Sequence, residues 1–186
     1  GEYIVVFDPL DGSSNIDVGV SIGTIFGIYR NVGNRPVTLD AFLQPGRNLV
    51  ASGYIVYGSS TVLTYTSGKT VDCFTLDPAS GEFFLTRRDV RMPTTSKILS
   101  VNECNQPYWP RWATTFLDHV KGRNRDDKRI VSGRHIGSLV VDFHRNLVNA
   151  NRQAHFTSQT YNFTRHIHTR QIRTGIWFSI TGLFGR

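Results

Sequence analysis

Short apolar runs separated by turn residues dominate the first half of the chain. Residues 3–7 form such a run, rich in β-branched side chains, and residues 18–30 resume it after a polar turn. Three more runs follow at residues 61–66, 71–76 and 82–85, with Gly-containing turns between them. Runs of this length, bounded by Gly, Pro, Asn and Ser, are typical of strands joined by tight turns. The pattern therefore predicts a strand at each run and a hairpin-rich sheet over residues 61–85.

Helical spacing of apolar residues appears at four places. We expect a buried helix over residues 48–57, a short helical turn over 39–43, and longer helices over 109–120 and 138–148. One further strand is expected at residues 97–101. The helix over 138–148 has the clearest pattern, because its first residue can cap it and four apolar residues share one face. These four are Leu139, Val140, Phe143 and Leu147.

Positive charge is concentrated near the end of the sequence. The formal net charge is +7, and residues 147–186 contain five Arg and no acidic residue, which leaves +2 for the rest. An even charge balance over the main body gives little support for nucleic-acid binding there. The basic tail, with its interleaved aromatics, leaves nucleic-acid contact open as a weaker alternative. No apolar run approaches the roughly 20 residues that span a bilayer, so we expect no membrane partner.

The two cysteines, Cys73 and Cys104, form no CxxC pair and have no His at metal-ligand spacing. We expect both to be free thiols in a reducing compartment, rather than a disulfide or a zinc site.

The segment with the strongest chemical signal is the octet Asp-Pro-Leu-Asp-Gly-Ser-Ser-Asn at residues 8–15. Asp8 and Asp11 leave an apolar strand on a turn stiffened by Pro, and Mg²⁺ prefers such oxygen ligands. The Gly-Ser-Ser that follows offers successive backbone N–H groups and hydroxyls for an anion. Cation ligands followed by a phosphate cradle suit a metal-dependent phosphatase. The alternative is an ordinary Asx turn between two strands.

The octet and its surroundings resemble class I fructose-1,6-bisphosphatases over about residues 2–148. The matching blocks, in order, read VVFDPLDGSSNIDVGVSIGTIFGIYR, LQPGRNLVASGYIVYGSST, FTLDPASGEF, ILSVNE and RHIGSLVVDFHRNL. Several separated blocks in one order make a chance match negligible. Related inositol monophosphatases usually carry Thr-Thr in the motif, and sedoheptulose-1,7-bisphosphatase lacks the Asn-Ile-Asp continuation. The resemblance therefore favours the fructose enzyme.

The resemblance implies a layered αβαβα sugar-phosphatase fold, of class α/β and incomplete. Residues 1–90 would be the C-terminal part of the N-terminal domain and would carry the metal motif. Residues 91–148 would open the C-terminal substrate domain. Residues 149–186 lack the Gly-Gly strand that the family has after Leu147, so we interpret them as an atypical tail from a frame shift, an intron or an artificial sequence. A lineage-specific basic tail is the alternative.

The resemblance also assigns roles within the octet. Asp8 and Asp11 would be carboxylate ligands of Mg²⁺, with Mn²⁺ or Zn²⁺ as alternatives, and would act in catalysis through the metal. The Leu10 carbonyl would be a further ligand. Gly12 and Ser13 would offer N–H groups to the phosphate at carbon 1.

Further substrate contacts are implied outside the first part of the octet. Ser14 would touch the sugar bisphosphate, and Asn102 and Arg134 would bind the 6-phosphate. From the residues alone, Asn102 is as well explained as a turn former and Arg134 as a solvated loop cation. His135 stands where the family usually has Tyr, so we expect weakened 6-phosphate binding. Cys104 replaces a Gly and would strain its loop if positive φ is required there.

The AMP inhibitor site of the family is only partly matched. Tyr3 and Arg30 agree with residues of that site, but Glu2 stands where many members have Lys. A carboxylate facing the AMP phosphate repels it, so we expect AMP inhibition to be weakened.

The implied function is Mg²⁺-dependent hydrolysis of the 1-phosphate of fructose 1,6-bisphosphate to fructose 6-phosphate and phosphate, in gluconeogenesis. We expect a cytoplasmic homo-oligomer, a tetramer by resemblance, since the Arg at position 134 reaches a neighbouring subunit's site in the family. The family draws further acidic ligands from segments outside this sequence, so we expect an internal fragment with impaired activity. A sedoheptulose-1,7-bisphosphatase and a non-catalytic remnant remain the alternatives.

Overall fold

The computed structural model divides into two compact units. One contains Gly1–Val90, and the other continues from Arg91. The residues that the structure describes are 1–33, 36, 38, 41, 44–91, 98–122, 132–149 and the backbone of 156–157. The predicted turn at 39–43 and nearly all of the tail lie outside these residues.

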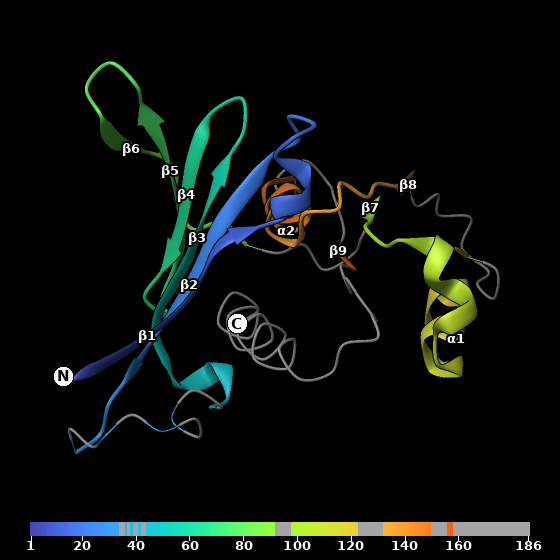
Figure 1. Ribbon diagram of the computed structural model, residues 1–186, viewed down its shortest axis with the longest axis horizontal. Helices are drawn as coiled ribbons and strands as arrows, with labels where there is room; N and C mark the ends of the chain where they lie inside the picture. The colour runs from blue at the N-terminus through green and yellow to red at the C-terminus, as the bar shows by residue number, and fades with distance from the viewer. Residues whose placement is uncertain are drawn as a thin grey trace. The chain divides into compact units, whose positions relative to one another are not determined.

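The first unit is built on a six-stranded antiparallel sheet whose strand order follows the chain (Figure 1). The strands are β1 (Tyr3–Asp11), β2 (Ile22–Arg30), β3 (Leu49–Tyr57), β4 (Thr61–Thr66), β5 (Val71–Asp77) and β6 (Glu82–Arg87). Each strand pairs with the next one along the chain. This confirms the predicted hairpin-rich sheet, although β2 begins four residues later than its apolar run.

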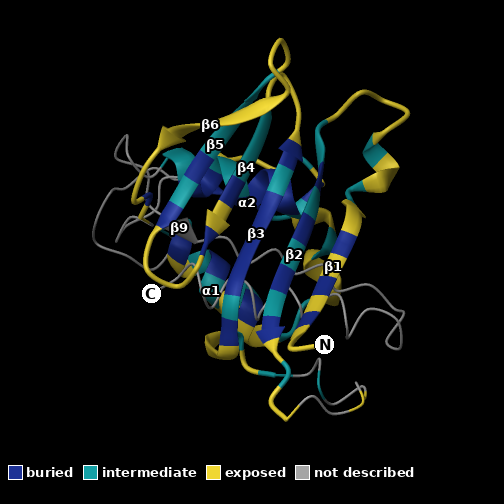
Figure 2. Ribbon diagram, turned by 90° about the vertical axis from the view of Figure 1, so that its left-hand side faces the viewer, coloured by how far each residue is buried: buried dark blue, intermediate teal, exposed yellow. Residues whose placement is uncertain are grey.

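The prediction of a helix over residues 48–57 is wrong. Those residues form β3, an interior strand between β2 and β4, preceded only by the 3-10 turn Gly46–Asn48. Four consecutive residues, 51–54, are buried, and Figure 2 shows β3 dark along most of its length. A strand buried on both faces reads as a continuous apolar run, which periodicity alone cannot separate from a buried helix.

Gly53 shows how closely the interior strands approach one another. A Cβ added there would lie 2.6 Å from the Thr64 carbonyl oxygen of β4 and 2.7 Å from Phe26 Cζ of β2. A glycine inside a strand is typical of such close backbone approach.

The two faces of the sheet differ sharply in exposure. On one face, Ile4, Val6, Ile25, Tyr29 and Tyr54 are all at most 7% exposed. On the other face the strand register aligns apolar side chains that remain exposed on β1, β3, β4 and β6. These are Tyr3, Val5, Phe7, Tyr57, Tyr65, Phe83 and Leu85. An exposed apolar surface of this extent is unusual for a soluble monomer.

The second unit contains two helices and a small parallel sheet. Its strands are β7 (Ile98–Leu99), β8 (Ser132–Gly133) and β9 (Phe156–Thr157), with β7 in the middle. Helix α1 (Arg111–Val120) packs Leu117 and Val120 against Leu99. Of the strand predicted at 97–101, the described residues 98–101 form a strand only in β7.

Helix α2 (Leu139–Asn149) agrees with the helix predicted over 138–148, and α1 agrees with the one predicted over 109–120. Three of the four predicted apolar residues of α2, Val140, Phe143 and Leu147, are at most 2% exposed. The α1 helix starts directly after Pro110, where the fixed φ of proline is compatible with a first turn. Neither helix of the described part is long and apolar enough to cross a membrane.

Both cysteines are free thiols. Cys73 is buried, with its Sγ 3.4 Å from the Thr64 hydroxyl, and burial raises the pKa of this thiol. Cys104 is exposed.

Val5 and Val6 lie on opposite faces of β1, so the same substitution should change the free energy of unfolding by different amounts at the two positions. Val6 is 7% exposed and Val5 is 54% exposed. Val6→Thr buries a hydroxyl and is expected to lower the free energy of unfolding by about 1–3 kcal/mol. Val5→Thr, the matched control, should change it by less than about 0.5 kcal/mol. Urea unfolding measures both, and equal losses would contradict the assignment of the two faces.

Candidate metal and phosphate site

A one-residue bulge in β1 brings Asp8 and Asp11 to the same face of the sheet. Asp8 pairs with Ile25 of β2, whereas Asp11 pairs with Gly23, so three steps along β1 match two along β2. Side chains in a regular strand alternate between faces, and a spacing of three would separate the two carboxylates. Because Ile25 and Gly23 share a face, their partners share it too. The bulge therefore converts a spacing of three into a pair of neighbouring carboxylates.

Hydrogen bonds on both sides stabilise this bulge. The Leu10 N–H donates to Asp8 Oδ1 at 3.1 Å. On the opposite face, the Thr24 hydroxyl donates to the Pro9 carbonyl at 2.9 Å, and Tyr57 Oη lies 2.9 Å from Thr24 Oγ1. Since Thr24 gives its single hydroxyl proton to Pro9, Tyr57 is the donor in that contact. Sequence analysis identified neither Thr24 nor Tyr57, because their role depends on strand register.

Gly12 begins the turn that follows the two carboxylates. Its φ of 80° lies in the left-handed region, and the 3-10 turn Ser13–Asn15 comes directly after it. The Asn15 N–H donates to the Gly12 carbonyl at 2.8 Å. The N–H groups of Ser13 and Ser14 precede this first bond of the turn, so the turn geometry leaves them to a ligand or water. Both residues are exposed.

The donor set of this segment fits a hard divalent cation in part. Asp8 is 9% exposed and Asp11 is half-buried, so a bound ion would be shielded from solvent on one side. Carboxylate and carbonyl oxygens are the ligands that Mg²⁺ selects. Within the described residues, no group of three or more His, Cys, Asp or Glu side chains could hold a metal ion. The segment supplies a pair of carboxylates.

Asn102 caps the short turn that follows it. Its Oδ1 accepts a hydrogen bond from the Cys104 N–H at 3.2 Å, at the start of the 3-10 turn Glu103–Tyr108. Its Nδ2 group makes no hydrogen bond within the described part of the chain and remains available as a donor. The strain considered for Cys104 is absent: among the described residues other than glycine, only Asp89 has positive φ. The loop therefore accommodates Cys104 without the penalty that a glycine position would impose.

Arg134 and His135 lie between β8 and α2, and both are exposed. The Arg134 N–H donates to the Leu99 carbonyl at 2.8 Å, and the Arg134 carbonyl accepts from Arg145 Nη2 at 2.8 Å. His135 Nδ1 lies 3.6 Å from Oδ2 of the fully buried Asp142. Sequence analysis missed Asp142 and Arg145, which read as ordinary polar positions of an amphipathic helix.

Tyr3 and Arg30 are brought together as a cross-strand pair of β1 and β2. Arg30 Cζ lies 5.5 Å from the centre of the Tyr3 ring, and Arg30 Nη2 donates to the Tyr3 hydroxyl at 3.4 Å. Glu2 is exposed directly before Tyr3. The three residues considered for an AMP site are therefore adjacent on the sheet edge.

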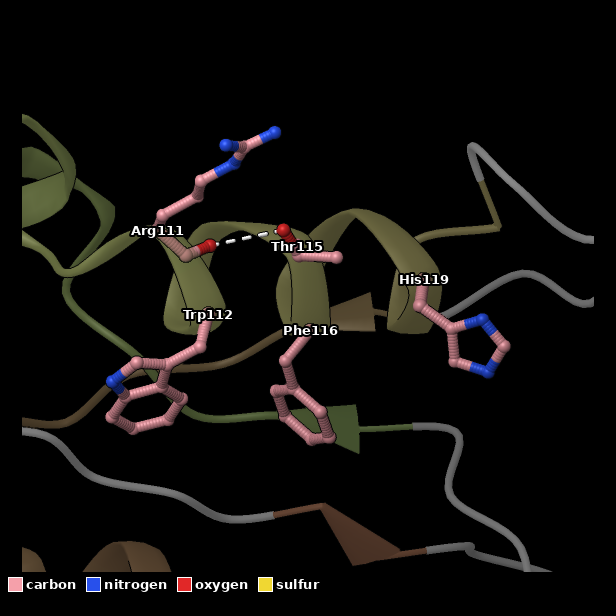
Figure 3. A pocket seen from close by; sticks show the side chains of 5 residues that line it. All are labelled: Arg111, Trp112, Thr115, Phe116 and His119. Carbon is pink, nitrogen blue, oxygen red and sulfur yellow. Dashed lines mark hydrogen bonds between the residues drawn. The ribbon is translucent and has the colours of Figure 1, made fainter.

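A separate hollow lies beside α1 (Figure 3). Trp112 and Phe116 project to one side of the helix, and the Arg111 guanidinium projects to the other. None of the residues predicted for metal, phosphate or AMP binding lines it. The residues predicted from the sequence lie elsewhere: on β1 and β2, in the turn after β1, at Asn102 after β7, and in the segment before α2.

Comparisons with known proteins agree with the sequence blocks. Residues 1–88 match the family model described as fructose-1-6-bisphosphatase, N-terminal domain. The solved structure of Leishmania major fructose-1,6-bisphosphatase in apo form is 42% identical, with a TM-score of 0.70 over 79% of this chain and 48% of that one. The T-state structure of the same enzyme has the same identity and TM-score and is covered to 47%. The chain thus spans about half the length of these enzymes.

These matches identify the fold as an incomplete α/β sugar-phosphatase fold of the fructose-1,6-bisphosphatase type.

The left-handed φ of Gly12 yields a prediction about the turn. Gly12→Ala should lower the free energy of unfolding by about 1–2 kcal/mol, because a Cβ is disfavoured at this φ. Gly12→Asn is the matched control and should cost clearly less, since Asn tolerates this conformation. Denaturant titration of the three proteins measures the difference. Equal costs for Ala and Asn would argue against the left-handed geometry.

Proposed function

We propose that the chain is a member of the fructose-1,6-bisphosphatase family and acts on fructose 1,6-bisphosphate, because residues 1–88 match the family model of its N-terminal domain. The reaction is hydrolysis of the 1-phosphate to fructose 6-phosphate and inorganic phosphate, the step used in gluconeogenesis. The observation that carries the proposal is the β1 bulge, which gathers Asp8 and Asp11 on one face directly before the Gly12 turn. The unit from Arg91 onward then corresponds to the start of the substrate domain.

Asp8, Asp11 and the Leu10 carbonyl would hold Mg²⁺, or Mn²⁺ or Zn²⁺ in its place. When bound, the metal neutralises phosphoryl charge and activates water, which is the main demand of phosphate-monoester hydrolysis. The backbone N–H groups of Gly12 and Ser13 orient the 1-phosphate. Water attacks phosphorus, the bond between phosphorus and the carbon-1 oxygen breaks, and that oxygen takes up a proton.

Asn102, Arg134 and His135 are the residues proposed to bind the 6-phosphate. The Asn102 Nδ2 donors and the exposed Arg134 guanidinium suit a phosphate, and Arg can bind it through two parallel hydrogen bonds. His135 supplies an imidazole N–H in place of the family's Tyr hydroxyl. Ser14 would contact the sugar bisphosphate. By family resemblance we further propose a homo-oligomer, a tetramer, working in the cytoplasm.

Two observations favour alternative functions. His135 changes the segment that would read the 6-phosphate, which leaves a related sugar bisphosphatase such as sedoheptulose-1,7-bisphosphatase as the second candidate. The described residues bring only two carboxylates to the site, and two-metal hydrolysis usually uses more. We therefore propose impaired turnover, with a non-catalytic remnant as its extreme form.

Phosphate release from fructose 1,6-bisphosphate by the 186-residue chain tests the proposal. We expect slow release that depends on Mg²⁺, falling in Asp11→Asn to the rate without Mg²⁺, because this variant removes one metal-binding charge. Asp77→Asn is the matched control: Asp77 is a half-buried Asp whose carboxylate accepts hydrogen bonds in the β5–β6 turn. Calorimetric titration with Mg²⁺ gives a second measurement that does not require turnover.

Release that is unaffected by Asp11→Asn would overturn the metal assignment. A folded chain that neither releases phosphate nor binds Mg²⁺ would support the non-catalytic remnant. Faster release from sedoheptulose 1,7-bisphosphate would transfer the proposal to the second candidate.

AMP affinity tests the position of Glu2 beside the Tyr3–Arg30 pair. We expect AMP to bind weakly to the wild-type chain, because the Glu2 carboxylate repels the phosphate. Glu2→Lys reverses this charge and should tighten binding about tenfold or more. Glu2→Gln, which only removes the charge, should give an intermediate value in the same calorimetric titration. Wild-type affinity equal to that of Glu2→Lys would contradict an AMP phosphate at this edge.

A further inference from the structure

Asp142 is a fully buried carboxylate in the first turn of α2 that has no role in the metal or phosphate contacts proposed above. Both of its oxygens lie 3.2 Å from the Ile136 N, and Oδ2 also accepts from the Gly137 N–H at 3.3 Å. A buried charge is retained only when it is paired and hydrogen-bonded. These donors all come from the segment that precedes α2.

Arg145, one turn further along α2, completes the arrangement. Its Nη2 donates to Asp142 Oδ1 at 2.8 Å and to the Arg134 carbonyl at 2.8 Å. The Arg134 N–H is bound on its other side to the Leu99 carbonyl of β7 at 2.8 Å. The backbone of Arg134 is therefore held from both ends, by a strand and by a helix.

The Arg134 side chain is less restrained than its backbone. It is exposed, and within the described part of the chain its guanidinium has no hydrogen-bond or ion-pair partner. His135, the next residue, places Nδ1 3.6 Å from Asp142 Oδ2. Each residue from 134 to 137 thus contacts Asp142 or Arg145, and the free guanidinium projects from a segment whose backbone is restrained.

We propose that Asp142 and Arg145 are positioning residues that hold residues 134–137 so that Arg134 and His135 bind the phosphate of a sugar phosphate. The inference rests on the proposed function and adds how the 6-phosphate segment is kept in place. Restraining a binding segment before the ligand arrives reduces the entropy lost on binding, and misplacement by about 1 Å can cost about a hundredfold. The Asp142–Arg145 pair contributes this restraint without touching the ligand.

Affinity for fructose 6-phosphate, measured by calorimetry on the full chain, tests the positioning role. Asp142→Asn keeps the shape of the side chain but removes the charge that pairs with Arg145. We expect it to weaken binding by about tenfold to a hundredfold. Asp77→Asn, which changes an Asp in a turn of the other unit, should leave the affinity unchanged. Wild-type affinity in Asp142→Asn would overturn the proposal.

A double-mutant cycle separates positioning from a general loss of structure. In an Arg134→Ala background the guanidinium is gone, so Asp142→Asn should cause only a small further loss of affinity. An equal fold-loss in both backgrounds would show that Asp142 does not act through Arg134 and would overturn the proposal. If Asp142→Asn does not fold, the half-exposed Arg145 takes its place in the cycle. Arg145→Met should then weaken binding, and Arg145→Lys should restore part of it.

Amide hydrogen exchange gives a measurement that needs no ligand. Asp142→Asn should speed exchange at Ile136 and Gly137 relative to the amides of α1. Unchanged exchange there would overturn the positioning role. If the wild-type chain binds neither fructose 6-phosphate nor inorganic phosphate, the proposed function fails for this chain. The restraint on residues 134–137 is then retained or overturned by the exchange measurement alone.

Discussion

The β1 bulge at Pro9 and Leu10 is the constraint on which the candidate chemistry depends. Strand alternation would place Asp8 and Asp11 on opposite faces, and only the extra residue brings both carboxylates to one side. The bulge is stabilised from the other face, where the Thr24 hydroxyl donates to the Pro9 carbonyl and accepts a hydrogen bond from the Tyr57 hydroxyl. The two carboxylates at the end of β1 are thus kept on one face by hydroxyl groups of β2 and β3. Thr24 and Tyr57 are not among the proposed metal ligands, but they help to determine where those ligands lie.

A similar arrangement of supporting hydrogen bonds occurs in the second unit. There the segment 134–137 has no regular structure, and its backbone groups are satisfied by Asp142 and Arg145 of α2 together with Leu99. In both units a short irregular segment carries the exposed polar groups, and buried or half-buried neighbours fix its path. Preorganised sites require such a division between exposed polar residues and the residues that support them.

The exposed apolar face of the six-stranded sheet is a surface that an isolated first unit leaves in contact with water. The exposed apolar side chains of that face each have about two-fifths to three-fifths of their surface accessible to solvent. Patches of this kind mark surfaces that contact other protein, and the chain spans about half of the enzymes it matches. The three residues that differ from the family pattern, Glu2, Cys104 and His135, are not among the side chains of this face. The substitution at Cys104 is accommodated without backbone strain, so the loop beside Asn102 keeps an ordinary geometry.

The sequence by itself determined the elements whose signal is local. Turn residues separate the strands of the sheet, Pro110 precedes α1, and the apolar face of α2 follows the spacing of Val140, Phe143 and Leu147. The octet at residues 8–15 likewise indicated the candidate site and the resemblance to fructose-1,6-bisphosphatases. Tertiary structure decided what depends on neighbours distant in sequence. Residues 49–57 became a strand because β2 and β4 flank them, although their apolar spacing resembles a buried helix. The shared face of Asp8 and Asp11 came from register with β2, and the hydrogen bonds of Asp142 came from a loop folding back onto its own helix. Pairing register and backbone satisfaction are properties of assembled elements, so no local pattern encodes them.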